Sequence, residues 1–147
     1  DLITDIMKFV RYCEKKDKLP CLRLNGTSDI QWEHIKIDGQ NIFEMFPDVQ
    51  FYDYTKIPTR KVEQYKNYHL TWSYSEANSK YAQYFDAIKY NIAVVFHGTM
   101  PIYYKGREVI DGDKSDIRFK DKPNVVVGLK AKGKARHDSS GFVIHTA

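Results

Sequence analysis

The stretch IAVVFHG, residues 92–98, decides the fold of this chain. Its centre, VVF at 94–96, is continuously apolar, and VVV at 125–127 is a second run of the same kind. Strands buried on both faces of a parallel sheet have such runs, because none of their positions faces water. The segments before residue 92 alternate between helical and extended patterns. The sequence therefore predicts a mainly parallel α/β sheet with crossover helices.

The other elements follow outward from this strand. Helices are expected up to about Asp17 and over 32–47 and 78–91, and strands over 21–26, 49–54, 68–75, 124–131 and 141–147. A hairpin over 102–110 is expected to turn at Lys105-Gly106. The length of 147 residues fits a single α/β domain, 1–147, with a C-terminal β-hairpin region. The chain begins without Met inside a helical pattern and ends inside a strand-like one, which predicts a piece of a longer protein.

Composition and charge narrow the class of protein. Hydrophobic residues make up 42% and charged residues 29% of the chain, as in ordinary soluble globular domains. The net charge is +4, and residues 105–136 hold ten Lys or Arg against five Asp or Glu, which favours anionic partners. Cys13 and Cys21 read as reduced thiols, and no apolar run has the length of a membrane span. A cytoplasmic location without a membrane partner is therefore expected.

Three predicted strands each carry one polar face. In the segment CLRLNGTSDI, 21–30, Arg23 and Asn25 alternate with Leu22 and Leu24. The next two strands place polar side chains at Gln50, Tyr52 and Tyr54, and at His69, Thr71 and Ser73. Unpaired polar groups do not sit in a core, so this face is expected to border a polar cleft at the carboxyl ends of the strands.

The cleft residues predict an anionic ligand. The ligand-binding candidates are Arg23, Asn25, Ser28, Tyr54, Thr71 and Ser73. Arg23 offers a rigid fork that suits a carboxylate or a phosphate. The alternative is a sheet with one solvated face and no ligand.

Asp29 and His97 are the only obvious proton-transfer pair in the sequence. A lone histidine after a buried strand is also a common structural residue, and this alternative stays open for His97. The sequence contains no complete set of nucleophile, base and oxyanion donors. Whether the chain is an enzyme therefore stays open.

The segment DGDKSD has three carboxylates within six residues, Asp111, Asp113 and Asp116. Such oxygen ligands suit Mg²⁺ or Ca²⁺, although an EF-hand is excluded because Lys122 stands where that loop requires Glu. Asp and Gly also dominate ordinary turns. We favour a turn in which Asp116 pairs with Arg118 over a metal site.

The segment GLKAKGKAR, residues 128–136, holds a cluster of basic side chains. Its cations are Lys130, Lys132, Lys134 and Arg136, with glycines at 128 and 133. Lysines beside glycine-freed backbone amides suit phosphate, although the spacing of a Walker A loop is missing. A solvated edge strand protected by lysines is the equal alternative. Tyr103 and Tyr104 on the hairpin offer base stacking, which favours nucleic acid, and Arg107, Arg118 and Lys120 are further candidate contacts.

Four blocks of the sequence resemble a phage protein family. The blocks are LRLNGTSDI (22–30), FYDYTK (51–56), YHLTWSYSE (68–76) and VIDGDKSDIRFKDKPNVVVGLKAKGKARHDSSGFV (109–143). They are similar, in this order, to the gene-product-eighty-eight-like proteins of mycobacteriophages. The resemblance implies a partial βα-barrel similar to that of radical-SAM enzymes, with a cysteine-rich N-terminal segment in full-length relatives. An iron–sulfur cluster needs several closely spaced thiolates, which Cys13 and Cys21 do not supply, so no cluster is expected in this chain.

Two functions follow from these patterns. In the first, a phage-encoded α/β domain binds an anionic, phosphate-bearing small molecule in the polar cleft, as an enzyme domain or its remnant. In the second, a phage accessory protein, for example a counter-defence factor, binds nucleic acid or a host protein through its basic C-terminal face. The first places the functional residues inside a cleft, and the second places them on an exposed basic surface.

Overall fold

The structure is a computed structural model that describes the backbone of residues 1–74 and 76–147 and the side chains outside 75–81. The chain divides into two compact units. The first unit comprises Asp1–Asp53 and Arg60–His69, and the second comprises Tyr54–Thr59 and Leu70–Ala147. The prediction of a single domain stays a prediction.

The sheet confirms the predicted fold class. Over the described residues eight strands follow the order β1-β2-β3-β4-β7-β6-β5, with β8 beside β4. Every pairing whose register is given is parallel except that of the hairpin strands β5 and β6. The sheet does not close into a barrel, which agrees with a partial barrel. The last position of the predicted strand 68–75, Ser75, lies outside the described residues.

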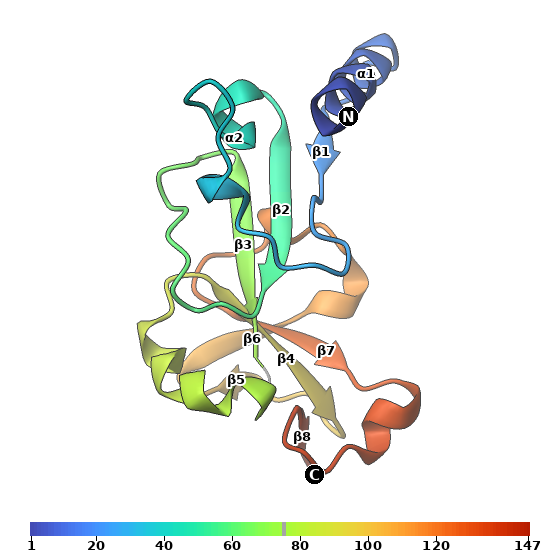
Figure 1. Cartoon of the computed structure of the whole chain (residues 1–147). Coiled ribbons are helices and arrows are strands. Elements are labelled where there is room, and N and C mark those ends of the chain that lie inside the picture. The colour runs from blue at the N-terminus through green and yellow to red at the C-terminus, as the bar shows by residue number, and fades with distance from the viewer. Residues whose placement is uncertain (75) are drawn as a thin grey trace. The chain divides into compact units, whose positions relative to one another are not determined.

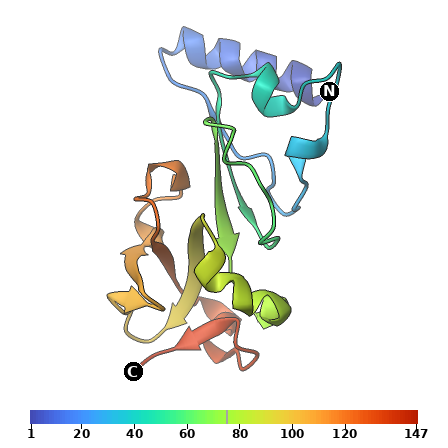
Figure 2. The same ribbon diagram turned by 90° about the vertical axis from the view of Figure 1, so that its left-hand side faces the viewer.

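The first unit begins with helix α1, Leu2–Lys15, which lies side-on in Figure 2. The Asp1 side chain caps it by accepting a hydrogen bond from the Thr4 amide, and Ile6 and Cys13 are buried. Strand β1, Cys21–Leu22, pairs in parallel with β2, Gln50–Thr55. Phe43 stacks on Tyr68 with ring centroids 4.1 Å apart and fills the core of this unit.

The predicted helix 32–47 is wrong over most of its length. The structure has a 3-10 turn η1, Trp32–His34, and a short helix α2, Ile42–Met45, which Asn41 and Glu44 close with a capping box. Between them Asp38 and Gly39 adopt φ of 53° and 81°, a left-handed backbone that no α-helix accommodates. The predicted helix 78–91 is also replaced, by the 3-10 helix η2, Glu76–Ala87.

The second unit is built around β4, Asn91–His97, as the apolar run predicts. Strand β3, Tyr68–Ser73, pairs with its first half through Thr71–Ser73, and β8, Val143–His145, pairs with its end (Figure 1). Strand β7, Val126–Lys130, lies on the other side and separates β4 from β6, Arg107–Asp111. The core of this unit contains Trp72, Phe85, Ile88, Ile92, Val94, Phe96 and Val126.

The hairpin is confirmed at its predicted turn. Strand β5, Tyr103–Tyr104, pairs antiparallel with β6, and Lys105 and Gly106 have φ of 47° and 82°. Two successive positive φ values give the turn that matches the twist of a two-residue hairpin. The remaining short turns of this unit are η3, Gly112–Lys114, η4, Arg118–Lys120, and η5, Gly133–His137.

Both cysteines are outside disulfides, with Cys13 in α1 and Cys21 in β1. Among the described residues no helix combines the length and the apolar character that crossing a membrane requires.

Candidate functional site

Four cations of the second unit lie on one short piece of chain, which we call the basic segment, residues 130–136. It leaves the carboxyl end of β7, whose Val126, Val127 and Gly128 are buried. Lys130, Lys132, Lys134 and Arg136 are all exposed. The edge-strand alternative is wrong, because β7 has β4 on one side and β6 on the other. These lysines therefore do not protect a sheet edge.

Asp113 is the carboxylate that contacts the start of the basic segment. Its Oδ2 accepts a hydrogen bond from the Lys130 amide at 2.9 Å, and its Oδ1 lies 3.6 Å from the Lys132 ammonium. Arg136 donates to the Gly133 carbonyl at 3.4 Å. Among the described residues no ion pair joins Lys134 or Arg136 to a carboxylate. Both of these cations are therefore available to an external anion.

The three aspartates of DGDKSD have different hydrogen-bond partners. The Asp111 side chain caps η3 by accepting a hydrogen bond from the Asp113 amide at 3.0 Å. The Asp113 carboxylate binds the Lys130 amide and the Lys132 ammonium. No three His, Cys, Asp or Glu side chains come together as a metal site within the described part of the chain. Asp116 contributes its carbonyl oxygen to the Arg118 amide. The geometry is that of a turn.

Arg118 is buried beneath this turn and pairs with Asp121 at 3.4 Å, where the sequence had predicted Asp116. Its Nη2 donates to the carbonyls of Gly112 and Ser115. Arg107 is also buried and donates to the carbonyls of Ile88 and Tyr90. Both arginines are buried and bind backbone carbonyls inside the unit, which disfavours these two further candidates as phosphate contacts, whereas Lys120 is exposed.

The first unit contains a buried polar network that the sequence reasoning missed. Arg60 binds Glu33 through two hydrogen bonds, Nε to Oε1 at 2.9 Å and Nη2 to Oε2 at 2.6 Å, and both side chains are almost fully buried. Asp29 lies 3.4 Å from Nη1 of the same guanidinium. Burial is the largest single influence on the pKa of Arg60 and lowers it, but the hydrogen bonds and charge of Glu33 together with Tyr68 raise this pKa above its ordinary value.

Tyr68 links this ion pair to a second buried carboxyl. Its hydroxyl accepts from Arg60 at 3.0 Å and donates to Asp53 Oδ2 at 2.9 Å, and Asp53 Oδ1 accepts from the Asn25 amide at 2.8 Å. Burial raises the pKa of Asp53, against the hydrogen bonds from Asn25 and Tyr68 that favour its charged form. Burial raises the pKa of Tyr68, and the Asp53 charge adds to this.

Asn25 explains why the predicted strand 21–26 pairs only at its first two residues. Its amide binds a side chain, Asp53, in place of a neighbouring strand. Its carboxamide oxygen accepts from Ser28 at 3.1 Å and from the Trp32 indole at 2.9 Å, and its nitrogen donates to the Ile30 carbonyl at 3.0 Å. The polar residues after β1 therefore hold a closed loop together through their own hydrogen bonds.

The predicted ligand residues fall in both units. In the first unit Arg23 donates to the carbonyls of Asn25 and Gly26, so Arg23, Asn25 and Ser28 all have partners in the loop. In the second unit Tyr54 and Ser73 are half-buried and Thr71 is fully buried. Asp29 belongs to the first unit and His97 to the second. The common cleft and the Asp29–His97 pair stay predictions.

Thr71 carries a polar group whose hydrogen bonding is not satisfied in the core. Its hydroxyl is buried and has no hydrogen-bond partner among the described residues. Thr55, buried in the same unit, instead accepts a hydrogen bond from the Ile57 amide at 3.1 Å. An unsatisfied buried hydroxyl costs stability, whereas a satisfied one contributes to it.

Replacing Thr71 by Val is therefore expected to raise the free energy of unfolding by about 1 kcal/mol. The matched substitution Thr55→Val is expected to lower it by about the same amount, because the Ile57 amide loses its acceptor. Urea unfolding of both variants measures the difference. A loss of stability in Thr71→Val as large as that in Thr55→Val would contradict the absence of a partner.

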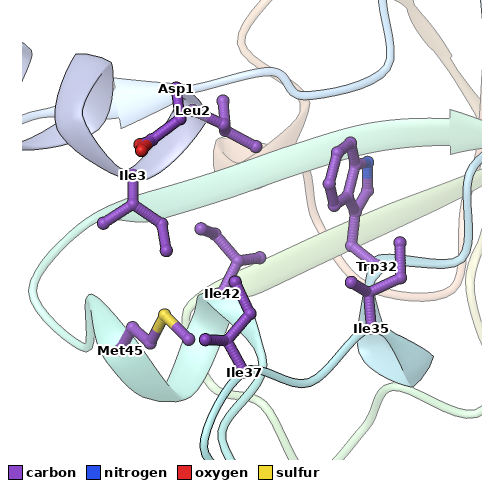
Figure 3. Close-up of a pocket in the computed structure, with 8 residues that line it drawn as sticks. All are labelled: Asp1, Leu2, Ile3, Trp32, Ile35, Ile37, Ile42 and Met45. Atoms are coloured by element: carbon purple, nitrogen blue, oxygen red, sulfur yellow. The ribbon is translucent and has the colours of Figure 1, made fainter.

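An apolar pocket of about 280 Å³ lies in the first unit (Figure 3). Its lining residues are Asp1, Leu2, Ile3, Trp32, Ile35, Ile37, Ile42 and Met45. Trp32 contributes its ring to this pocket and its indole nitrogen to Asn25. The pocket has a single charged lining residue, Asp1, and therefore does not match the anionic ligand that the sequence predicts.

Comparison with known proteins identifies a family. The family model described as Gene product 88 matches residues 1–146, and the chain belongs to this family. The phage resemblance read from the four sequence blocks is thus confirmed at the level of the family. No curated protein and no solved structure matches the chain.

Proposed function

We propose that this member of the Gene product 88 family binds nucleic acid through its phosphates, with the basic segment as the contact. The observation that carries the proposal is the position of four exposed cations at and just beyond the end of an interior strand. A solvated edge no longer explains them, and turn formation by itself does not require lysines. Lysine and arginine are the side chains that neutralise phosphates in nucleic-acid complexes.

The hairpin contributes one exposed aromatic ring to the same unit. Tyr103 is 68% exposed, which suits stacking on an unpaired base. Tyr104 does not share this role, because its ring packs edge-on against Phe85 and Phe96. The proposed contact therefore combines phosphate binding by the basic segment with stacking by Tyr103 on single strands.

Nucleic-acid affinity is expected to fall steeply with salt. Each phosphate contact releases counterions and adds roughly 0.7–0.9 to the log–log slope of affinity against salt. The double substitution Lys132→Ala with Lys134→Ala is expected to flatten this slope by roughly 1.5 and to weaken all sequences alike. The fold is expected to persist, since exposed lysines contribute little to stability. Fluorescence anisotropy with single- and double-stranded oligonucleotides from low to moderate salt measures both effects.

The control removes the same charge from another surface. Lys8 and Lys15 are exposed on α1, and Lys8→Ala with Lys15→Ala lowers the net charge equally. This control is expected to leave most of the slope in place. If both double variants flatten the salt slope equally, the effect depends on net charge alone, which would contradict the assignment to the basic segment. Absence of binding at low salt would reject nucleic acid and leave a host protein as the partner.

A small anionic ligand is the second candidate, and the Thr71 hydroxyl favours it. A buried donor without a partner is the kind of group that a ligand or an ordered water satisfies. In this reading the unit is an enzyme domain of the radical-SAM-like type or its remnant. Inorganic phosphate that raises the unfolding temperature of the natural chain, but not of Thr71→Val, would support this candidate.

A further inference from the structure

Two histidines meet at the ends of neighbouring strands in the second unit. The parallel register of β4 and β8 pairs His97 with His145, and the two strand ends lie side by side near the C-terminus in Figure 1. The Nδ1 atoms of the two rings are 3.2 Å apart, and the ring planes are nearly perpendicular, at 85°. Both side chains are exposed.

The backbone holds this pair closely together. Thr146 donates its amide to the His97 carbonyl at 2.8 Å, which continues the ladder past the two histidines. Gly98 permits the approach: it has φ of +105°, and a Cβ there would lie 2.3 Å from the Thr146 carbonyl oxygen. Any other residue at position 98 would push the end of β8 away from β4.

The hydrogen bond at the far side of His145 fixes its tautomer. Its Nε2 lies 2.7 Å from the Asp138 carbonyl oxygen. A carbonyl oxygen only accepts hydrogen bonds, so the His145 Nε2 carries the ring proton. In the neutral ring the Nδ1 atom that faces His97 is therefore unprotonated and presents its lone pair. The Asp138 side chain is itself held by Ser140 at 2.7 Å and by the Val143 amide at 3.2 Å.

This arrangement has the features of a metal-ligand pair. Imidazole nitrogens bind Zn²⁺ at about 2.0–2.1 Å, so two of them in a tetrahedral site lie about 3.3 Å apart. The observed separation is 3.2 Å. Histidines that bind metals also donate their other ring N–H to a carbonyl or carboxylate, as His145 does to Asp138. Imidazole suits Zn²⁺, Ni²⁺ and Cu²⁺ and discriminates against Mg²⁺ and Ca²⁺.

We propose that His97 and His145 bind a divalent transition-metal ion through their Nδ1 atoms. Among the described residues no third His, Cys, Asp or Glu joins them, so water completes the coordination. The site is therefore weaker than a structural zinc site with four protein ligands, and its open positions face solvent. It is independent of the basic segment, since neither histidine belongs to residues 130–136.

The experiment titrates the full chain, free of any polyhistidine tag, with Zn²⁺ and separately with Ni²⁺. We expect one ion per chain. His97→Gln and His145→Gln are each expected to weaken binding by at least about tenfold, since even changes behind a metal ligand cost 10–100-fold. The matched control is His137→Gln: His137 is exposed on η5, only eight positions before His145, and this variant is expected to bind like the natural chain.

A second measurement uses the natural sequence, so it does not depend on the folding of a variant. Nitrogen-15 NMR of the rings is expected to show Zn²⁺ shifting the Nδ1 resonances of His97 and His145 while the His145 Nε2 stays protonated. The Nδ1 proton that His97 donates to His145 in the free chain moves to the His97 Nε2 when the metal binds. The proposal is overturned if Zn²⁺ leaves both Nδ1 resonances unchanged, or if His137→Gln loses as much affinity as His97→Gln. In either case the pair is an ordinary hydrogen bond between rings.

Discussion

Replacing Arg60 by Met is expected to lower the free energy of unfolding by about 3–5 kcal/mol. Arg60 forms the two short hydrogen bonds that compensate for burying Glu33. Met keeps the length and the apolar character of the arginine stem, so the change removes charge and hydrogen bonds but little volume. Glu33 would then be buried without a counter-charge, and Tyr68 would lose a donor. Urea unfolding followed by circular dichroism measures the loss.

The double variant Arg60→Met with Glu33→Met separates pairing from packing. Buried ion pairs replaced together by apolar residues are often neutral in stability, because the cost of dehydrating both charges disappears. We expect the double variant to recover most of the loss, so that the two substitutions are strongly non-additive. A double variant that loses as much as the sum of the single variants would show that the ion pair is not what holds this part of the first unit.

The elements that the sequence predicted well are those whose signal is local. Strands β4 and β7 follow from continuous apolar runs, and burial of Ile92, Val94 and Val126 confirms them. The hairpin follows from Lys105-Gly106, because the turn needs positive φ at just these two residues. In each case the information lies within a few neighbouring residues.

The buried network escaped prediction because its partners are far apart in the sequence. Arg60 and Glu33 are 27 positions apart, and Asn25 and Asp53 are 28 apart. One signal was available: Asp53 alternates in phase with Phe51, so a carboxylate occupied the apolar face of its strand. A charge at a core position needs a buried partner. Arg60, in a loop between strands, gave no pattern that identified it as that partner.

The polar residues after β1 show how one pattern has two causes. Polar side chains at a strand end predict a ligand, and they equally well satisfy the backbone of a closed loop. The backbone amide of Asn25 binds Asp53, and both polar atoms of its side chain are also occupied, by Ser28, Ile30 and Trp32. Alternation alone does not tell these causes apart, because it fixes the face of a side chain but not its hydrogen-bond partner.

The second large effect is expected for Trp72→Ala, which should lower the free energy of unfolding by about 3–5 kcal/mol. Trp72 is fully buried, and its ring packs against Tyr74 and Phe85 with centroids 6.0 and 6.4 Å away. The indole also donates to the Lys56 carbonyl at 3.4 Å. Truncation to Ala leaves a cavity in the core of the second unit. Urea unfolding, together with amide exchange of β4, measures the loss and locates it.

Two controls divide this effect into its parts. Trp72→Phe keeps most of the ring contacts but loses the donor, so a clearly smaller loss is expected. Tyr103→Ala removes a ring that is 68% exposed and is expected to change stability within about 0.5 kcal/mol. Comparable losses for Trp72→Ala and Tyr103→Ala would contradict the placement of Trp72 at the centre of this core.

Adjacent positions of β3 therefore respond in opposite directions. Thr71→Val is expected to stabilise because it removes an unpartnered hydroxyl, and Trp72→Ala to destabilise because it empties the core. Propensity does not produce this pattern, since Val and Trp both favour strands. It arises because neighbouring side chains of one strand point to opposite faces. If both variants destabilised the unit by similar amounts, both faces of β3 would be fully packed, and the polar face on which the ligand hypothesis rests would be lost.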